Sequence, residues 1–223
     1  MRRTGGIALL ALALGIGGAL GAGALEAELV YVLGDVEVRR RGAPQEAEIG
    51  MLLGSGDVME TGADGMAILH VPGRADLKLR EDTVLALDSL GQDLTVSLSR
   101  GGVFSRVLAG LTGRYRVVTQ TAVAGVRGTE FFVAYGRSID EYPDLWLCVN
   151  SGSVEVVIPD RGESVLVEQG KGINIVGGVR LTRPRAYPWT RRLNWNTDPG
   201  QGEVIDRTNL GQAYSDLLDQ DYD

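Results

Sequence analysis

The sequence predicts an all-β domain of short stacked strands arranged as a roll or solenoid, with a β-sandwich as the alternative. Apolar residues alternate with polar ones in short runs, the period of a strand with one face inward and one toward solvent. Glycine is frequent, 32 of 223 residues against an average near ~7%, whereas proline occurs 7 times. Turn signals recur about every 8–12 residues, a spacing typical of all-β folds.

The alternating runs extend from Leu29 to Val179. In one of them Leu77 and Leu79 flank Lys78, so we expect the leucines in the core and Lys78 on the solvent face. No long stretch shows the 3.6-residue period of a helix, which argues against a βαβ nucleotide-binding fold. The predicted core contains Val36, Val38, Ile68, Leu77, Leu79, Leu85, Leu87, Val96, Leu98, Val117, Phe131, Val133, Leu147, Val154, Val156, Val167 and Ile175.

Glycine-rich and Asx-containing segments separate these runs, because such residues accept a positive φ or bond to their own backbone. The predicted turns are Gly34-Asp35, Gly54-Ser55-Gly56-Asp57, Gly62-Ala63-Asp64-Gly65, Pro72-Gly73, Gly101-Gly102, Asn150-Ser151-Gly152 and Gly170-Lys171-Gly172.

The first 24 residues are typical of a signal peptide. Arg2 and Arg3 precede an uncharged run from Ile7 to Ala24, which ends in Ala-Gly-Ala. A charged start, an apolar segment and a small-residue end are the parts of a secretory signal, so we expect cleavage after Ala24 and a mature chain without an integral membrane span. The alternative is an uncleaved anchor, since about 18 apolar residues are marginal for crossing a bilayer.

The remaining chain divides into a β-domain over residues 28–180 and a C-terminal extension over residues 181–223. The extension contains Pro184 and Pro188, which interrupt regular structure. We expect it to be partly irregular, with a short helix between Gly211 and Asp223. Its tryptophans, Trp189 and Trp195, either bind a sugar or partner surface or pack the extension against the β-domain.

Charge and composition exclude several classes of function. The formal net charge is −7 with no dense basic run, which disfavours nucleic-acid binding. The single histidine, His70, excludes a multi-histidine metal site and makes a catalytic triad improbable. The single cysteine, Cys148, lies in an apolar run and is expected to be buried. We therefore expect no catalytic residues, no metal and no cofactor.

The most distinctive segment is Thr-Ala-Val-Ala-Gly-Val-Arg-Gly-Thr-Glu-Phe at residues 121–131. Its glycines permit a tight bend, and Arg127 lies between small and apolar neighbours. Such an arginine either fixes a corner of the fold through a carboxylate or strand-end carbonyls, or faces a ligand or partner. The candidate binding residues here are Arg127, Gly128, Thr129 and Glu130, together with Trp189 and Trp195 in the extension.

This segment resembles the characteristic motif of the FecR domain family. Other pieces match in the same order, over roughly Leu29 to Val176. They are Gly-Asp-Val-Glu-Val at 34–38, Gly-Asp-Val-Met-Glu-Thr-Gly-Ala-Asp-Gly-Met-Ala at 56–67, Leu-Ser-Arg-Gly-Gly-Val at 98–103, Val-Asn-Ser-Gly-Ser-Val-Glu-Val at 149–156 and Gln-Gly-Lys-Gly at 169–172.

The resemblance implies an extracytoplasmic all-β domain without catalysis. In the founding members this domain receives a signal from an outer-membrane transporter and relays it to a sigma factor. Because a signal peptide is expected at residue 1 here, we do not expect direct control of a sigma factor.

We expect a non-catalytic binding, scaffold or signal-sensing module in the periplasm or cell envelope, whose partner is an envelope protein or a glycan. Two alternatives stay open. The first is a membrane-tethered signalling regulator that keeps its N-terminal anchor. The second is a polysaccharide-active enzyme that uses two carboxylates on a β-scaffold. Acidic pairs such as Glu81-Asp82 and Asp140-Glu141 flank predicted turns, where solvated side chains are the simpler account.

Overall fold

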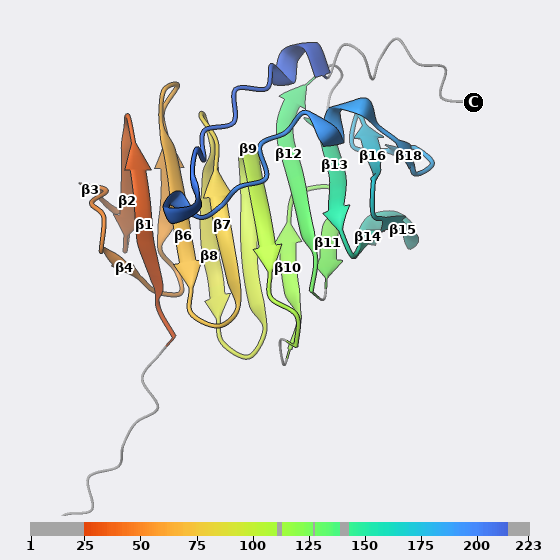
Figure 1. Cartoon of the computed structure of the whole chain (residues 1–223). Coiled ribbons are helices and arrows are strands. Elements are labelled where there is room, and N and C mark those ends of the chain that lie inside the picture. The colour runs from red at the N-terminus through yellow and green to blue at the C-terminus, as the bar shows by residue number, and fades with distance from the viewer. Residues whose placement is uncertain (1–24, 111–112, 127, 139–142, 214–223) are drawn as a thin grey trace, which may run out of the picture.

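The computed structural model describes residues 25–110, 113–126, 128–138 and 143–213. In these residues the chain forms strands that pair into two layers, with only short helical turns (Figure 1). The predicted all-β class is confirmed. The chain passes repeatedly from one layer to the other, as in a roll, while the layers pack face to face, as in a sandwich.

Layer A contains β1 (Ala27–Leu33), β4 (Leu52–Leu53), β6 (Met66–Val71), β7 (Ala75–Leu79), β12 (Glu130–Ser138), β13 (Pro143–Ser151), β16 (Lys171–Val176), β17 (Arg180–Leu181) and β18 (Arg185–Ala186). Layer B contains β2 (Val36–Arg40), β3 (Ala43–Glu46), β5 (Val58–Thr61), β8 (Val84–Leu90), β10 (Tyr115–Val118), β11 (Val123–Val126), β14 (Ser153–Ile158) and β15 (Glu163–Glu168). The 3₁₀ turns are η1 (Pro159–Arg161), η2 (Pro188–Arg191) and η3 (Pro199–Gln201).

In both layers the order of the strands across the sheet follows the order of the chain closely. Layer A runs in the order β4-β1-β6-β7-β9-β12-β13-β16, with β17 and β18 on the outer edge of β16. Layer B runs in the order β3-β2-β5-β8-β9-β10-β11-β14-β15. All of these pairs are antiparallel except β9 with β10.

Strand β9 (Leu94–Val107) belongs to both layers. Its first half pairs with β8 in layer B, and its second half pairs with β7 and β12 in layer A. The crossing falls at Gly101-Gly102, where a turn was predicted. Gly101 has φ +89°, and a Cβ there would lie 2.3 Å from Thr83 Oγ1 and 2.4 Å from Thr83 Cα. The predicted turn is therefore wrong: the two glycines let one continuous strand change layers in close contact with β8.

The main core lies between the layers and contains all the predicted core residues except Ile68. Tyr115 of layer B and Phe131 of layer A meet edge to face with ring centroids 6.0 Å apart. The hydroxyl groups of Tyr115 and Ser105 are 2.8 Å apart across the same interface. Ile68 is also fully buried, but it lies on the other side of layer A.

The outer face of layer A carries a second apolar cluster. Phe104, Phe132 and Trp146 lie on neighbouring strands, with ring centroids 4.5 Å apart in the first pair and 5.5 Å in the second. Residues 182–213, called the tail here, cover this cluster and run across the front of β6, β7, β9 and β12 (Figure 1). The expectation that one face of each strand meets solvent is therefore wrong for β7, in which all five residues are buried.

Lys78 is the clearest departure from that expectation. Its side chain is fully buried on the outer face of β7. Its Nζ donates to the carbonyl oxygens of Asn194 at 2.5 Å, Asn196 at 2.8 Å and Val204 at 3.1 Å, all in the tail. It also lies 4.2 Å from the centroid of the Phe104 ring. An ammonium group has three donors, so the tail satisfies each of them with a backbone carbonyl.

A buried ion pair fixes the tail beside Lys78. Arg80 Nη1 and Asp206 Oδ2 are 2.9 Å apart, with side-chain exposures of 5% and 2%. Asp206 Oδ1 accepts from the amide of Asn194 and from the hydroxyl of Thr208, both at 2.9 Å. The extension is irregular, as predicted, and helical at residues 210–213; the rest of the predicted helix over 211–223 lies outside the described residues.

Candidate functional site

The distinctive segment at residues 121–131 passes from layer B to layer A. Its first part forms β11, which pairs with β10 and β14 in layer B, and its last part begins β12 in layer A. Gly128 stands between them with φ +60°, a left-handed conformation that suits glycine. Arg127 lies outside the described residues, so the predicted role of this arginine stays a prediction.

Thr129 and Glu130 brace the bend rather than face open solvent. Thr129 is 1% exposed, and its Oγ1 donates to the carbonyl oxygen of Ser153 at 2.9 Å. Glu130 Oε2 accepts a hydrogen bond from the side-chain amide of Asn150. Both contacts join the start of β12 to the turn between β13 and β14.

Both tryptophans of the extension pack onto layer A. Trp189 is 7% exposed within the outer cluster, and the Arg192 guanidinium lies 4.6 Å from its ring centroid. Trp195 meets Phe104 edge to face at 5.3 Å, and its Nε1 donates to the carbonyl oxygen of Thr190 at 2.9 Å. Of the two uses predicted for these residues, the structure shows packing of the extension.

The outer face of layer B is open around β11. Strand register places side chains in two rows across β9, β10, β11, β14 and β15. The upper row reads Thr95, Arg116, Gly125, Glu155 and Leu166, and the lower row reads Ser97, Val118, Val123, Val157 and Ser164. Leu166 is 56% exposed at the end of the upper row. The predicted family motif therefore supplies the centre of this surface.

A groove of about 870 Å³ follows these rows. It is lined by Asp93, Gly113, Arg114, Arg116, Val123, Gly125, Val126, Ser153, Glu155, Val157 and Leu166. Gly125 forms a hollow in its floor, because Arg116 and Glu155 stand on either side and the glycine has no side chain between them. We call this surface the β11 groove.

Charges of both signs line the β11 groove. Arg116 forms an ion pair with Asp93, which also accepts from the amide of Arg114 at 3.0 Å. The sequence alone did not identify these residues, because their proximity depends on the register of four strands. The only local signal was a glycine inside the strand Val-Ala-Gly-Val, a position that often marks a close approach to the backbone.

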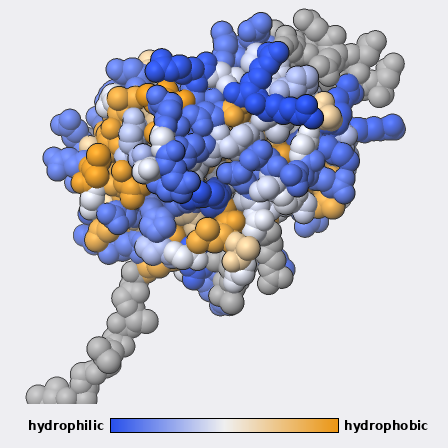
Figure 2. Space-filling view, viewed as in Figure 1, coloured by the Kyte–Doolittle hydropathy of each residue, from blue (hydrophilic) through white to orange (hydrophobic). Residues whose placement is uncertain are grey.

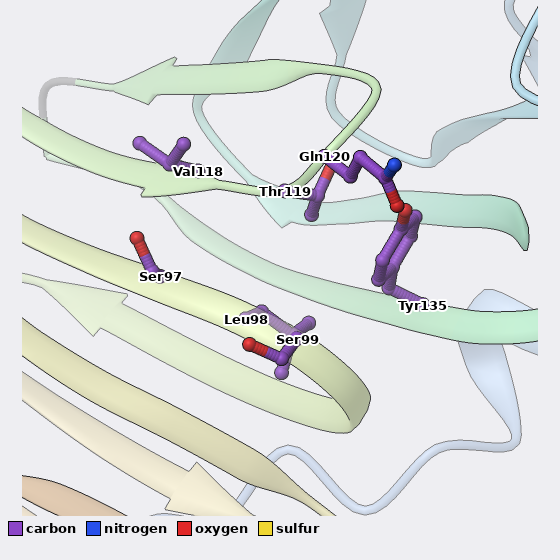
Figure 3. A pocket seen from close by; sticks show the side chains of 7 residues that line it. All are labelled: Ser97, Leu98, Ser99, Val118, Thr119, Gln120 and Tyr135. Atoms are coloured by element: carbon purple, nitrogen blue, oxygen red, sulfur yellow. The ribbon is translucent and has the colours of Figure 1, made fainter.

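A second pocket of about 320 Å³ opens beside the groove, where β9 and β10 diverge (Figure 3). Ser97, Leu98 and Ser99 line it from β9, and Val118, Thr119 and Gln120 line it from the end of β10. The side chains of Gln120 and Tyr135 point toward one another across it (Figure 3). Burial raises the pKa of Tyr135, an effect that the neighbouring Thr121 partly offsets. The pocket can offer hydroxyl and amide groups to a small polar group.

The reactive side chains of the described residues are engaged in structural contacts. Cys148 is fully buried, and burial raises the pKa of its thiol to about 12. His70 Nδ1 lies 2.7 Å from Asp76, which also forms an ion pair with Arg106 at 2.6 Å. No group of three or more metal-ligating side chains occurs in the part of the chain that the structure describes.

The acidic pairs also fit structural roles where the structure describes them. Glu81 forms an ion pair with Arg80 at 2.7 Å. The other pair, Asp140-Glu141, lies outside the described residues. No helix among the described residues is long and apolar enough to cross a membrane.

The opposite side of the molecule offers a weaker candidate. Across the front of layer A the tail presents a largely hydrophilic surface, and apolar residues gather over the first strands (Figure 2). The exposed apolar side chains at this end are Leu33, Ile49 and Leu52, with exposures of 40%, 66% and 49%. None of them lines either of the two pockets described above, so the β11 groove is the better candidate site.

Comparisons with known proteins agree with this fold. The family described as FecR protein matches residues 57–163, which include β11 and most of the β11 groove. Two crystal structures of a proposed anti-sigma factor from Parabacteroides distasonis ATCC 8503 are similar to this chain, each with a TM-score of 0.53 and 18% identity. Each match covers 72% of this chain and 72% of the other.

No curated protein matches the chain significantly. At 18% identity the two crystal structures support the fold alone, whereas the family match rests on the sequence of residues 57–163. That match includes the distinctive segment at 121–131, with the Gly62-Ala63-Asp64-Gly65 turn before it and the Asn150-Ser151-Gly152 turn after it. Residues 57–163 of this chain are therefore a FecR domain by sequence.

Proposed function

We propose that this protein is a non-catalytic binding module outside the cytoplasm that takes part in signal regulation by binding an envelope protein or a glycan. The FecR domain supports a regulatory role. The similar fold of the Parabacteroides protein, whose name describes an anti-sigma factor, points in the same direction.

One observation carries the binding part of the proposal. Strand β11, which comes from the most characteristic segment of the sequence, forms the floor of an open groove of about 870 Å³. A strand needed only for the core would direct its distinctive residues inward. Here Val123 and Gly125 face the groove, while Ala124 and Val126 complete the core.

The engagement of the reactive groups supports a role without catalysis. A thiol with a pKa near 12 is protonated at neutral pH and is a poor nucleophile. His70 is bound to Asp76, and Asp76 is also bound to Arg106. A binding role uses the groove as it stands and requires none of these groups to react.

Site-specific photocrosslinking in the source cells tests the binding role. A photoreactive residue at Leu166 places the probe in the β11 groove, and one at Leu52 places it at the opposite end of the molecule. We expect one specific adduct from Leu166, absent from Leu52. Adducts of equal yield from both positions, or none from the groove, would contradict the proposal.

Export is tested separately by the mature N-terminus. If the first 24 residues are a cleaved signal, mass spectrometry of the protein from the envelope fraction should find a chain that starts at Leu25. A chain that retains residues 1–24 and partitions with membranes would favour the tethered regulator instead. A chain found in the cytoplasm would overturn the extracytoplasmic part of the proposal.

A further inference from the structure

Gly125 is a glycine that the fold itself does not require. It lies inside β11 without a positive φ. A Cβ at this position would meet only the carbonyl oxygen of Glu155, at an ordinary contact distance of 3.9 Å. Glycine destabilises a strand interior relative to alanine, because it loses more conformational freedom on folding. Neither the backbone conformation nor the packing of the described chain therefore requires glycine at this position.

The surroundings of Gly125 form a small hollow with a defined shape. Arg116 of β10 and Glu155 of β14 are its direct neighbours in register. Val123 and Val157 form an apolar floor next to it, and Leu166 closes the far side. A glycine in such a position allows another backbone or a small side chain to approach the sheet closely.

The groups that flank the hollow carry opposite charges. Glu155 is exposed, and among the described residues it forms no ion pair. On the other side Arg114 is exposed. The Nη2 of Arg116 donates to Asp93. The Nε of Arg116 is buried and meets no acceptor among the described residues. The groove thus offers donors on the β10 side and a carboxylate on the β14 side.

We propose, building on the binding function above, that the β11 groove binds an extended segment of a partner protein. A small residue of that segment, Gly, Ala or Ser, enters the hollow over Gly125. An acidic residue on one side binds Arg114 and Arg116, and a basic residue on the other side binds Glu155. The apolar contacts with Val123, Val157 and Leu166 stabilise the segment between them.

The lining of the groove favours a protein segment over a glycan. Sugar rings stack on aromatic faces, and none of the lining residues is aromatic. Aliphatic side chains and separated opposite charges instead match the mixed side chains of a peptide. Opposite charges on either side also fix the direction in which a segment lies, which gives specificity.

Peptide selection against the intact folded protein tests this assignment. Phage-displayed random peptides are enriched on the wild-type protein and then measured against three variants. Gly125→Leu fills the hollow, Glu155→Lys reverses its charge, and Glu37→Leu adds the same leucine side chain to the outer face of β2, away from the groove. Circular dichroism melting confirms that each variant is folded before binding is measured.

We expect the enriched peptides to share a small residue between an acidic and a basic one. Gly125→Leu should weaken their binding by at least about tenfold, while Glu37→Leu leaves it unchanged. Glu155→Lys should also weaken binding, and peptides in which the basic residue is replaced by an acidic one should recover it. This recovery would show that Glu155 contacts the peptide directly.

The other outcomes separate this inference from the proposed function. If the enriched peptides bind the Gly125→Leu variant as tightly as the wild-type protein, the β11 groove is not their docking site. The proposed binding function would still stand. A glycan array that binds the wild-type protein, when no peptide is enriched, overturns the protein segment as the occupant. If no peptide is enriched but a specific Leu166 adduct forms in cells, only this inference is rejected. If no peptide is enriched and that adduct is also missing, the proposed function fails too.

Discussion

A single buried ammonium group explains much of how the tail is held. The chain has 20 arginines and only two lysines, yet a lysine stands where the outer face of β7 meets the tail. The Lys78 site needs three donors directed from one point toward three carbonyl oxygens. A compact ammonium group meets this geometry, whereas the planar guanidinium of arginine does not.

Burial lowers the pKa of Lys78 from 10.5 to about 8. Between these two pKa values the unfolded chain binds more protons than the folded chain. The contribution of Lys78 to the free energy of unfolding therefore rises with pH across this window. The same contribution is lost as the pH falls through about 8. We expect ¹⁵N NMR of the lysine side chains to show one amine titrating near pH 8. Lys171→Arg, which removes the exposed second lysine, assigns the signal.

Chemical denaturation checks the sign of this effect. The free energy of unfolding of the wild-type protein minus that of Lys78→Met should increase between pH 8 and pH 10. A difference that is constant or decreases over this interval would contradict the depressed pKa.

The buried ion pair between Arg80 and Asp206 supports a second prediction at this scale. Asp206→Asn leaves the Arg80 charge buried beside only the partly exposed Glu81, so we expect a loss of about 3 kcal/mol in the free energy of unfolding. Glu168→Gln, which breaks the exposed pair with Lys171, is the matched control and should cost much less, because solvent screens an exposed pair. Equal losses would mean that the tail ion pair contributes no more than a surface pair. Urea unfolding curves measure both.

Individual strands show where reading the sequence succeeded and where it failed. Alternation identified the inward faces correctly, because the inward residues of both layers are mostly apolar, as Leu85 and Leu87 illustrate. It failed on the outer face of β7, because a lysine between leucines has the pattern of a solvent-facing residue. Only the tail, more than a hundred residues later in the chain, makes that position buried.

The crossing of β9 between layers was also hidden from the sequence. Two consecutive glycines resemble a turn, and no local signal distinguishes a turn from a strand that bends without stopping. The groove residues Arg116 and Glu155 were missed for a related reason, since their proximity is set by the pairing of β10, β11 and β14. The motif at 121–131 did indicate the right region of the molecule.

Two glycine substitutions in strands should have opposite effects. Gly101→Ala places a Cβ 2.3 Å from Thr83 Oγ1 at φ +89°, so we expect a loss of more than about 3 kcal/mol. Gly125→Ala meets no such contact and removes the conformational cost of glycine, so we expect a gain of about 0.5–1 kcal/mol. Thermal unfolding of the two variants tests this contrast, which would be lost if both substitutions destabilised the protein.

At the scale of the whole molecule, the tail converts two layers into three over part of their surface. It covers Phe104, Phe132 and Trp146, which are nearly or completely buried beneath it. A chain that ends after Leu181 would expose this cluster and should self-associate more strongly than the full chain. Size-exclusion chromatography and binding of a hydrophobic dye measure that change.

Lysine labelling gives the same prediction a local readout. In the full chain an amine-reactive ester should modify Lys171, which is exposed, and leave Lys78 unmodified under the tail. In the shortened chain both should react. A shortened protein that self-associates no more than the full chain and keeps Lys78 unreactive would show that the tail is not the cover inferred here.

The distance in sequence between Lys78 and its carbonyl partners has a consequence for biogenesis. The partners lie 116 to 126 residues after Lys78, so a ribosome completes almost the entire β-body before it makes the residues that cover it. Until then the growing polypeptide carries an uncovered aromatic surface and an ammonium group without its three carbonyl acceptors. Such an intermediate is a natural client for a chaperone, and premature termination late in the reading frame would yield an aggregating product rather than a smaller working protein.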